Sequence, residues 1–187
     1  MGETTVNPLA VQPEFDLEEF MNFTKESRIA NEALEHLISL WESWRNELQA
    51  VTIQHKGKSG LAIWLPEGIE RYVDEAWQKS PGEGFLINGL AQYMCMAAVQ
   101  DVIPQAADGG CAPSPQPALP LTEALGELGL IDRAKSGLNL LRRYAILSYY
   151  PFKGGCEICA MWEQCPKANG HGEFASVVLP GHERGKD

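Results

Sequence analysis

The sequence predicts a mainly α fold, a compact helical domain with at most one short β-hairpin and a C-terminal cysteine-rich loop. Apolar residues recur in steps of three and four along several segments, as amphipathic helices require. Two capping boxes, Asp16 with Glu19 and Ser80 with Glu83, mark helix starts. A strand-like pattern stands out in one stretch only, residues 51–65. At 187 residues the chain is long enough for one domain with a real core.

The expected elements follow in chain order. Residues 1–15 are expected to form a flexible N-terminal arm, residues 16–150 the helical domain, and residues 151–187 a cysteine-rich segment packed on it. Two short apolar runs flank the turn-rich residues 56–60 and predict the hairpin. Within the helical domain, helices are expected at residues 16–26, 28–50, 67–79, 80–102, 122–130 and 136–149.

The formal charge of −10 is distributed unevenly. Residues 1–110 hold 7 Lys and Arg against 17 Asp and Glu, whereas residues 111–187 hold 8 of each kind. Such an acidic surface repels phosphate backbones, so no nucleic-acid partner is expected. One basic group could oppose this trend, and we interpret it as a solvated helix face beside a loop, the alternative being a patch that faces an acidic partner or an anionic cofactor. Its members are Arg133, Lys135, Arg142, Arg143 and Lys153.

The chain shows no sign of membrane insertion or export. Its apolar runs are far shorter than the roughly 20 residues that span a bilayer, so no membrane span is expected. Residues 1–13 contain Glu3 but no Lys or Arg, unlike a secretory or mitochondrial signal. A cytoplasmic location is therefore the default expectation.

Five cysteines occur, and three of them, Cys156, Cys159 and Cys165, lie within ten residues of one another. An odd number of cysteines in a chain without an export signal argues against a disulfide framework. The three form a C-x2-C-x5-C-P pattern, in which Gly154 and Gly155 ease the turn before the first thiolate. Proline directly after a ligand cysteine is also found in bacterial ferredoxin segments. The pattern predicts a metal-binding loop.

This C-x2-C-x5-C spacing, over about ten residues, resembles two known cluster-binding segments. One is the C-terminal cysteine trio of RecB-like nucleases that carry a four-iron cluster, and the other is the auxiliary-cluster segment of radical-SAM maturases. The catalytic acidic residues and lysine of those nucleases have no convincing counterpart here, and the C-x3-C-x2-C motif of the maturases is absent. The resemblance therefore implies a cluster and no particular reaction.

We interpret the cysteines as ligands of a [4Fe–4S] cluster, with zinc as the alternative. Iron–sulfur is favoured because the third cysteine follows too closely for a second zinc-binding pair. A cubane needs a fourth ligand, and Cys111, in the glycine-rich loop at residues 109–113, is our first choice. The alternatives are Cys95, His171 or an open position.

The predicted function is that of a [4Fe–4S] protein acting in electron transfer, or as an accessory subunit of a larger redox system. Its expected partner is a redox enzyme or complex, approached through the acidic surface of the first 110 residues. Two alternatives remain: a helical adaptor stapled by zinc, and an enzyme that uses a three-cysteine cluster with an open iron. No H-E-x-x-H, G-x-S-x-G or G-x-G-x-x-G motif occurs, and no catalytic residue is assigned.

Overall fold

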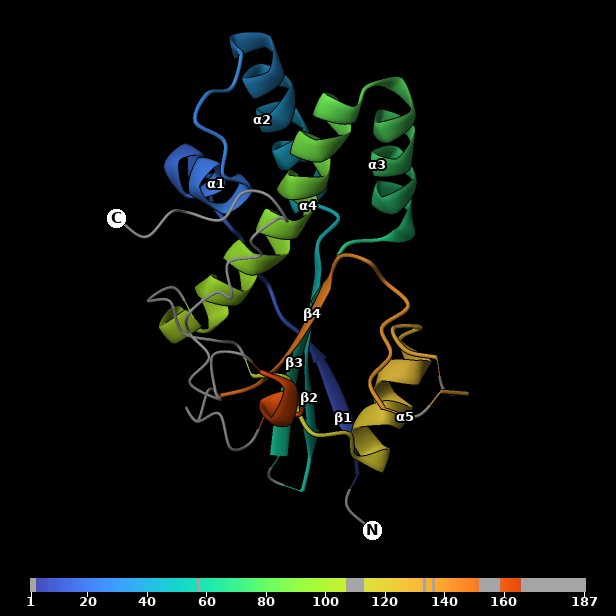
Figure 1. Cartoon of the computed structure of the whole chain (residues 1–187). Coiled ribbons are helices and arrows are strands. Elements are labelled where there is room, and N and C mark those ends of the chain that lie inside the picture. Colours follow the sequence, from blue (N-terminus) through green and yellow to red (C-terminus); the bar gives the residue numbers. More distant parts are fainter. Residues whose placement is uncertain are drawn as a thin grey trace, which may run out of the picture.

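The computed structural model of the chain describes residues 3–56, 58–106, 113–132, 134–135, 137–151 and 159–165 (Figure 1). Five α-helices and four strands are found in this part of the chain, together with short 3-10 turns. In chain order the elements are β1 (Thr5–Pro8), α1 (Leu17–Thr24), α2 (Asn31–Arg45), β2 (Gln49–His55), β3 (Lys58–Trp64), α3 (Glu67–Lys79), α4 (Pro81–Val102), η1 (Pro104–Ala106), α5 (Leu119–Glu127), β4 (Ala145–Tyr149) and η3 (Trp162–Gln164).

The four strands form one antiparallel sheet in the order β1-β2-β3-β4. The β2–β3 hairpin is the one that the sequence predicts, and Lys56 takes a positive φ of 46° at its turn. The outer strands come from distant parts of the chain. β1 pairs with β2 from before the first helix, and β4 pairs with β3 after all five helices.

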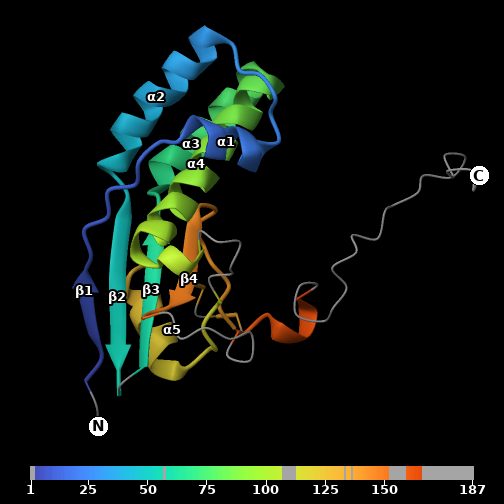
Figure 2. The same ribbon diagram turned by 90° about the vertical axis from the view of Figure 1, so that its left-hand side faces the viewer.

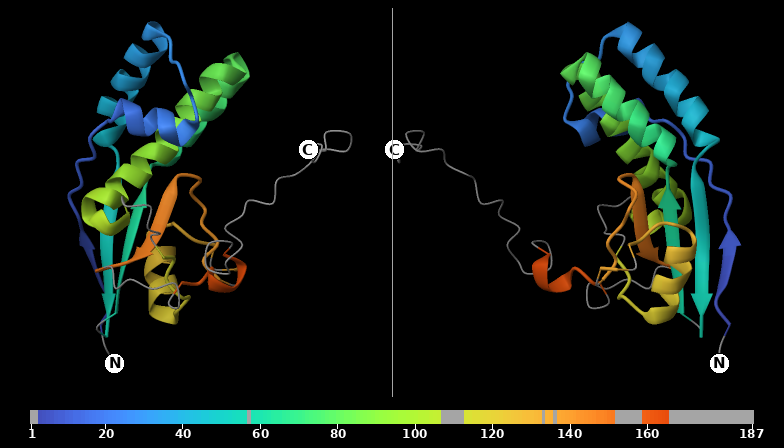
Figure 3. Two further views of the ribbon diagram at one scale, coloured as in Figure 1. Left: turned by 60° about the vertical axis from the view of Figure 1, so that its left-hand side comes forward. Right: turned by 90° about the vertical axis from the view of Figure 1, so that its right-hand side faces the viewer.

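Helices cover both faces of the sheet, so the fold has three layers (Figures 2 and 3). Alternate residues of each strand point to opposite faces. Leu61 and Ile63 of β3 pack toward α4, whereas Ala62 between them packs toward α5. On the α4 side the buried partners are Val11, Ala50, Ala98, Val99 and Ile103, and on the α5 side they are Val51, Ile53, Ala124, Leu125, Leu130, Ile131 and Leu147.

The helices α1 to α4 build a second core beyond the end of the sheet (Figure 1). Tyr93 of α4 lies at its centre, with the rings of Phe20 and Trp41 at centroid distances of 5.7 and 5.5 Å. The Tyr93 hydroxyl donates a hydrogen bond to the Glu19 carboxylate at 3.1 Å, which satisfies an otherwise buried polar group. Burial raises the pKa of Tyr93. This aromatic core fixes α1 and α2 against α4.

Both capping boxes begin helices as the sequence predicts. The side chain of Asp16 accepts a hydrogen bond from the Glu19 amide at 2.9 Å, and Ser80 accepts one from the Glu83 amide at 3.4 Å. The third helix, α3, has the predicted bounds. No helix in the described part of the chain is long and apolar enough to cross a membrane.

The predicted fold class, mainly α with at most one hairpin, is wrong, because β1 and β4 extend the hairpin to a four-stranded sheet. The helix expected at residues 136–149 is replaced by a loop and β4. In the loop, the Leu141 amide donates to the Leu130 carbonyl at 2.9 Å, and Ile131 bridges Leu140. Pairing with residues distant in sequence therefore outweighs a local helical pattern.

Other boundaries also differ from the expectation, and the helix expected at residues 122–130 is α5, Leu119–Glu127. The second helix stops at Arg45 rather than at residue 50, because Gln49 and Ala50 already pair with β3. The segment expected as a flexible arm, residues 1–15, contains β1 and the buried Val11 in its described part.

A close approach between α3 and α4 generates a stability prediction. A Cβ atom added at Gly84 would lie 2.6 Å from Trp77 Cδ2 and 2.7 Å from Trp77 Cα, whereas nothing lies within 4 Å of one added at Gly68. We expect Gly84→Ala to destabilise the fold by about 1–3 kcal/mol through overpacking. Gly68→Ala, the matched control in α3, should stabilise it by up to ~1 kcal/mol through helix propensity. Urea unfolding measures both, and equal effects of the two variants would contradict this packing.

Candidate functional site

The described part of the cysteine segment is a tight double turn around η3. Cys159 and Cys165 flank it, and both side chains are partly exposed. The Trp162 amide donates to the Cys159 carbonyl at 3.1 Å, and the Cys165 amide donates to the Trp162 carbonyl at 3.2 Å. The Met161 amide lies 3.4 Å from the Cys159 sulfur and donates a hydrogen bond to it. These bonds fold the five intervening residues into a compact arc.

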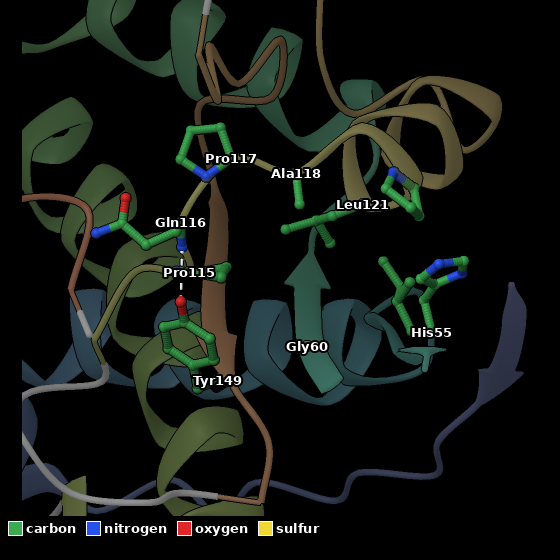
Figure 4. A pocket seen from close by; sticks show the side chains of 10 residues that line it. His55, Gly60, Pro115, Gln116, Pro117, Ala118, Leu121 and Tyr149 are labelled. Carbon is green, nitrogen blue, oxygen red and sulfur yellow. Dashed lines mark hydrogen bonds between the residues drawn. The ribbon is translucent and has the colours of Figure 1, made fainter. Parts of the chain in front are cut away.

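This segment lies beyond the β4 edge of the sheet, on the side opposite β1 (Figures 2 and 3). The Ala160 amide donates a hydrogen bond to the Ser114 carbonyl at 2.9 Å. Ser114 belongs to residues 113–116, which are hydrogen-bonded to Tyr149 at the end of β4. The Tyr149 amide donates to the Pro113 carbonyl at 3.2 Å, and the Gln116 amide donates to the Tyr149 hydroxyl at 2.9 Å (Figure 4). Residues 113–116 are therefore hydrogen-bonded both to the last strand and to the cysteine segment.

The four predicted ligands are only partly described. Cys159 and Cys165 belong to one compact turn, whereas Cys111 and Cys156 lie outside the described residues, as does the alternative ligand His171. Among the residues that are described, no group of three or more His, Cys, Asp or Glu side chains is arranged to hold a metal ion. Any centre at this position would need ligands from outside the described residues, such as Cys111, Cys156 or His171.

Cys95, another alternative for the fourth ligand, lies in the core of the helical layer. It is 1% exposed, and its thiol donates to the Tyr144 carbonyl at a sulfur–oxygen distance of 3.6 Å. Burial raises the pKa of Cys95 to about 12. Because metals bind the thiolate, a thiol held neutral in this way is a poor ligand. Cys95 acts here as a small buried side chain.

The described members of the predicted basic group contact carboxylates. Arg143 forms a two-pronged ion pair with Asp74, at 2.7 and 3.2 Å, which lowers the pKa of that carboxyl. Arg142 lies 3.5 Å from Glu67. Lys135 lies 3.6 Å from Asp132, while Arg133 and Lys153 fall outside the described residues. The two arginines tie the segment before β4 to α3.

A pocket that the sequence did not indicate opens next to residues 113–116 (Figure 4). Its volume is about 180 Å³, and its walls come from β2, β3, β4, the loop before α5 and the first turn of α5. No motif predicts it, because it depends on which residues the strand register places side by side. The lining residues are Ile53, His55, Gly60, Pro115, Gln116, Pro117, Ala118, Pro120, Leu121 and Tyr149.

Comparisons of the chain with protein-family models, with curated proteins and with solved structures found no match.

The contrast between the cysteines gives a labelling prediction. In metal-free native protein, iodoacetamide should modify Cys159 and Cys165 readily, because both are partly exposed. Cys95 should react at least ~100-fold more slowly, because its buried thiol is almost never ionised. Mass spectrometry of the digested protein measures each site. In urea the difference should disappear, and rapid labelling of Cys95 in the native protein would contradict its place in the core.

Proposed function

We propose that the chain binds a [4Fe–4S] cluster through Cys111, Cys156, Cys159 and Cys165, and acts in electron transfer or as an accessory subunit of a larger redox system. The observation that carries this proposal is the hydrogen bond from the Ala160 amide to the Ser114 carbonyl. Cys111 precedes Ser114 by three residues, a reach of at most ~11 Å. A thiolate on Cys111 is therefore within reach of a centre that includes Cys159, next to Ala160.

The surroundings of the Cys159 sulfur support a cluster ligand. An amide N–H, that of Met161, already points at this sulfur. Hydrogen bonds from backbone amides to cysteine sulfurs stabilise the thiolate and are one means by which a protein sets the potential of a cluster. The preceding C-x2-C step would add Cys156 from the same turn of chain.

The exposed position of the segment supports a role in electron transfer. Met161 is 54% exposed and Trp162 is 38% exposed, so two large apolar side chains face outward between the cysteines. Aromatic residues and methionine are enriched where proteins meet. A redox partner that covered these side chains would approach the cluster directly, and the acidic first 110 residues would steer a basic partner toward it.

Metal analysis of anaerobically purified protein tests the proposal. We expect a brown sample with a broad absorption band near ~400 nm and about four irons and four sulfides per chain. Cys159→Ser should remove most of the iron, because it removes one thiolate and loosens the loop that the ligands fold. Cys95→Ala is the matched control, and it should keep the full iron content. A colourless protein with one tightly bound zinc would contradict the cluster and support the zinc-stapled adaptor.

A second variant in the same assay identifies the fourth ligand. Cys111→Ala should lower the iron content and shorten the lifetime of the cluster in air, because one iron loses its thiolate. An unchanged spectrum, iron content and lifetime would remove Cys111 from the ligand set. The fourth position would then be held by another ligand, such as His171, or left open, and an open iron is expected for an enzyme rather than an electron carrier.

A further inference from the structure

A glycine, Gly60, lies at the floor of the pocket beside β4. Ile53, Gly60 and Tyr149 lie in one row across β2, β3 and β4, because Ile53 pairs with Gly60 and Gly60 pairs with Tyr149. Residues in such a row point to the same face of a sheet. Ile53 packs toward α5, so the row faces α5. Since Gly60 carries no side chain, a gap separates Ile53 from Tyr149 at the floor of the pocket.

The opposite wall is rich in proline. It is formed by Pro115 and Pro117, in the loop before α5, and by Pro120 and Leu121 in the first turn of α5. Each proline has a fixed φ, so the wall loses little freedom when a ligand binds. The hydrogen bond from the Gln116 amide to the Tyr149 hydroxyl closes one side at 2.9 Å. The site is therefore formed before any ligand arrives, as is usual for small-molecule pockets.

The lining selects the kind of ligand. None of the ten lining residues is Lys, Arg, Asp or Glu, and most are apolar, so a charged ligand would lose its hydration without gaining an ion pair. The volume of about 180 Å³ is close to that of an engineered cavity of about 150 Å³ in another protein that binds benzene. His55 lies across the pocket from Tyr149 in Figure 4; its Nδ1 is hydrogen-bonded to the Thr4 hydroxyl at 3.0 Å, which leaves Nε2 for one polar substituent.

We propose that this pocket is a binding site for a small neutral aromatic molecule, of the size of phenol or indole. Pro115 and Gln116 line the pocket, and Ser114 just before them accepts the hydrogen bond from Ala160, so the ligand would lie close to the candidate metal site. None of the proposed metal ligands in the described part of the chain lines the pocket, so binding there requires no metal.

An NMR titration with phenol and with indole tests the inference. We expect saturable shifts of the Ile53 methyl and Tyr149 ring signals. Benzoate, which has a similar ring but a negative charge, should bind at least about tenfold more weakly than phenol. Absence of saturable binding by both neutral probes, or benzoate binding as tightly as phenol, would overturn the assignment.

Variants at the pocket floor separate binding from folding. An added Cβ at Gly60 would lie 3.6 Å from Leu121 Cδ1 and 3.7 Å from the Ser148 carbonyl oxygen, which is ordinary contact. Gly60→Ala should therefore fold and weaken phenol binding severalfold. Gly60→Val, which fills more of the gap and favours a strand, should weaken it at least tenfold. Gly68→Ala in α3 is the control and should leave affinity unchanged. Unchanged phenol affinity in Gly60→Ala and Gly60→Val would overturn the proposal.

Discussion

The pairing of β4 with β3 is the constraint on which the rest of the structure depends. It joins residues more than eighty positions apart in the chain, from Gly60 opposite Tyr149 to Trp64 opposite Ala145. This register completes the sheet and sets the floor of the pocket. A shift of one residue would move every β4 side chain to the other face of the sheet.

The helical layer fixes where β4 begins. Tyr144, immediately before the strand, is buried, and its hydroxyl donates to the Asn88 side chain of α4 at 2.9 Å. Its carbonyl accepts from the Leu65 amide at 2.9 Å and from the Cys95 thiol. The ion pair of Arg143 with Asp74 adds a tie to α3. At the other end, Tyr149 holds residues 113–116 through both its amide and its hydroxyl. The strand thus links the helical core to the candidate site.

The sequence predicts what is encoded locally and misses what depends on distant partners. The capping boxes at Asp16 and Ser80 and the β2–β3 hairpin are local signals, and all three elements are present. β1 has four exposed residues and ends in Pro8, so no alternation reveals it. β4 is a five-residue run that becomes a strand only beside β3. The spacing of the cysteines is a local pattern, so the sequence alone predicts candidate metal ligands. The pocket depends on the pairing of Gly60 with Ile53 and Tyr149, which no local motif indicates.

The central claim is that the thiolates of Cys111, Cys156, Cys159 and Cys165 hold a cluster of four irons. X-ray absorption spectroscopy at the iron and zinc edges of the anaerobically purified chain tests it most directly, because it reports the neighbours of the metal itself. We predict an iron edge whose nearest neighbours are all sulfur, with a second shell of neighbouring irons. A zinc edge with four sulfur neighbours and no metal in the second shell would contradict the claim.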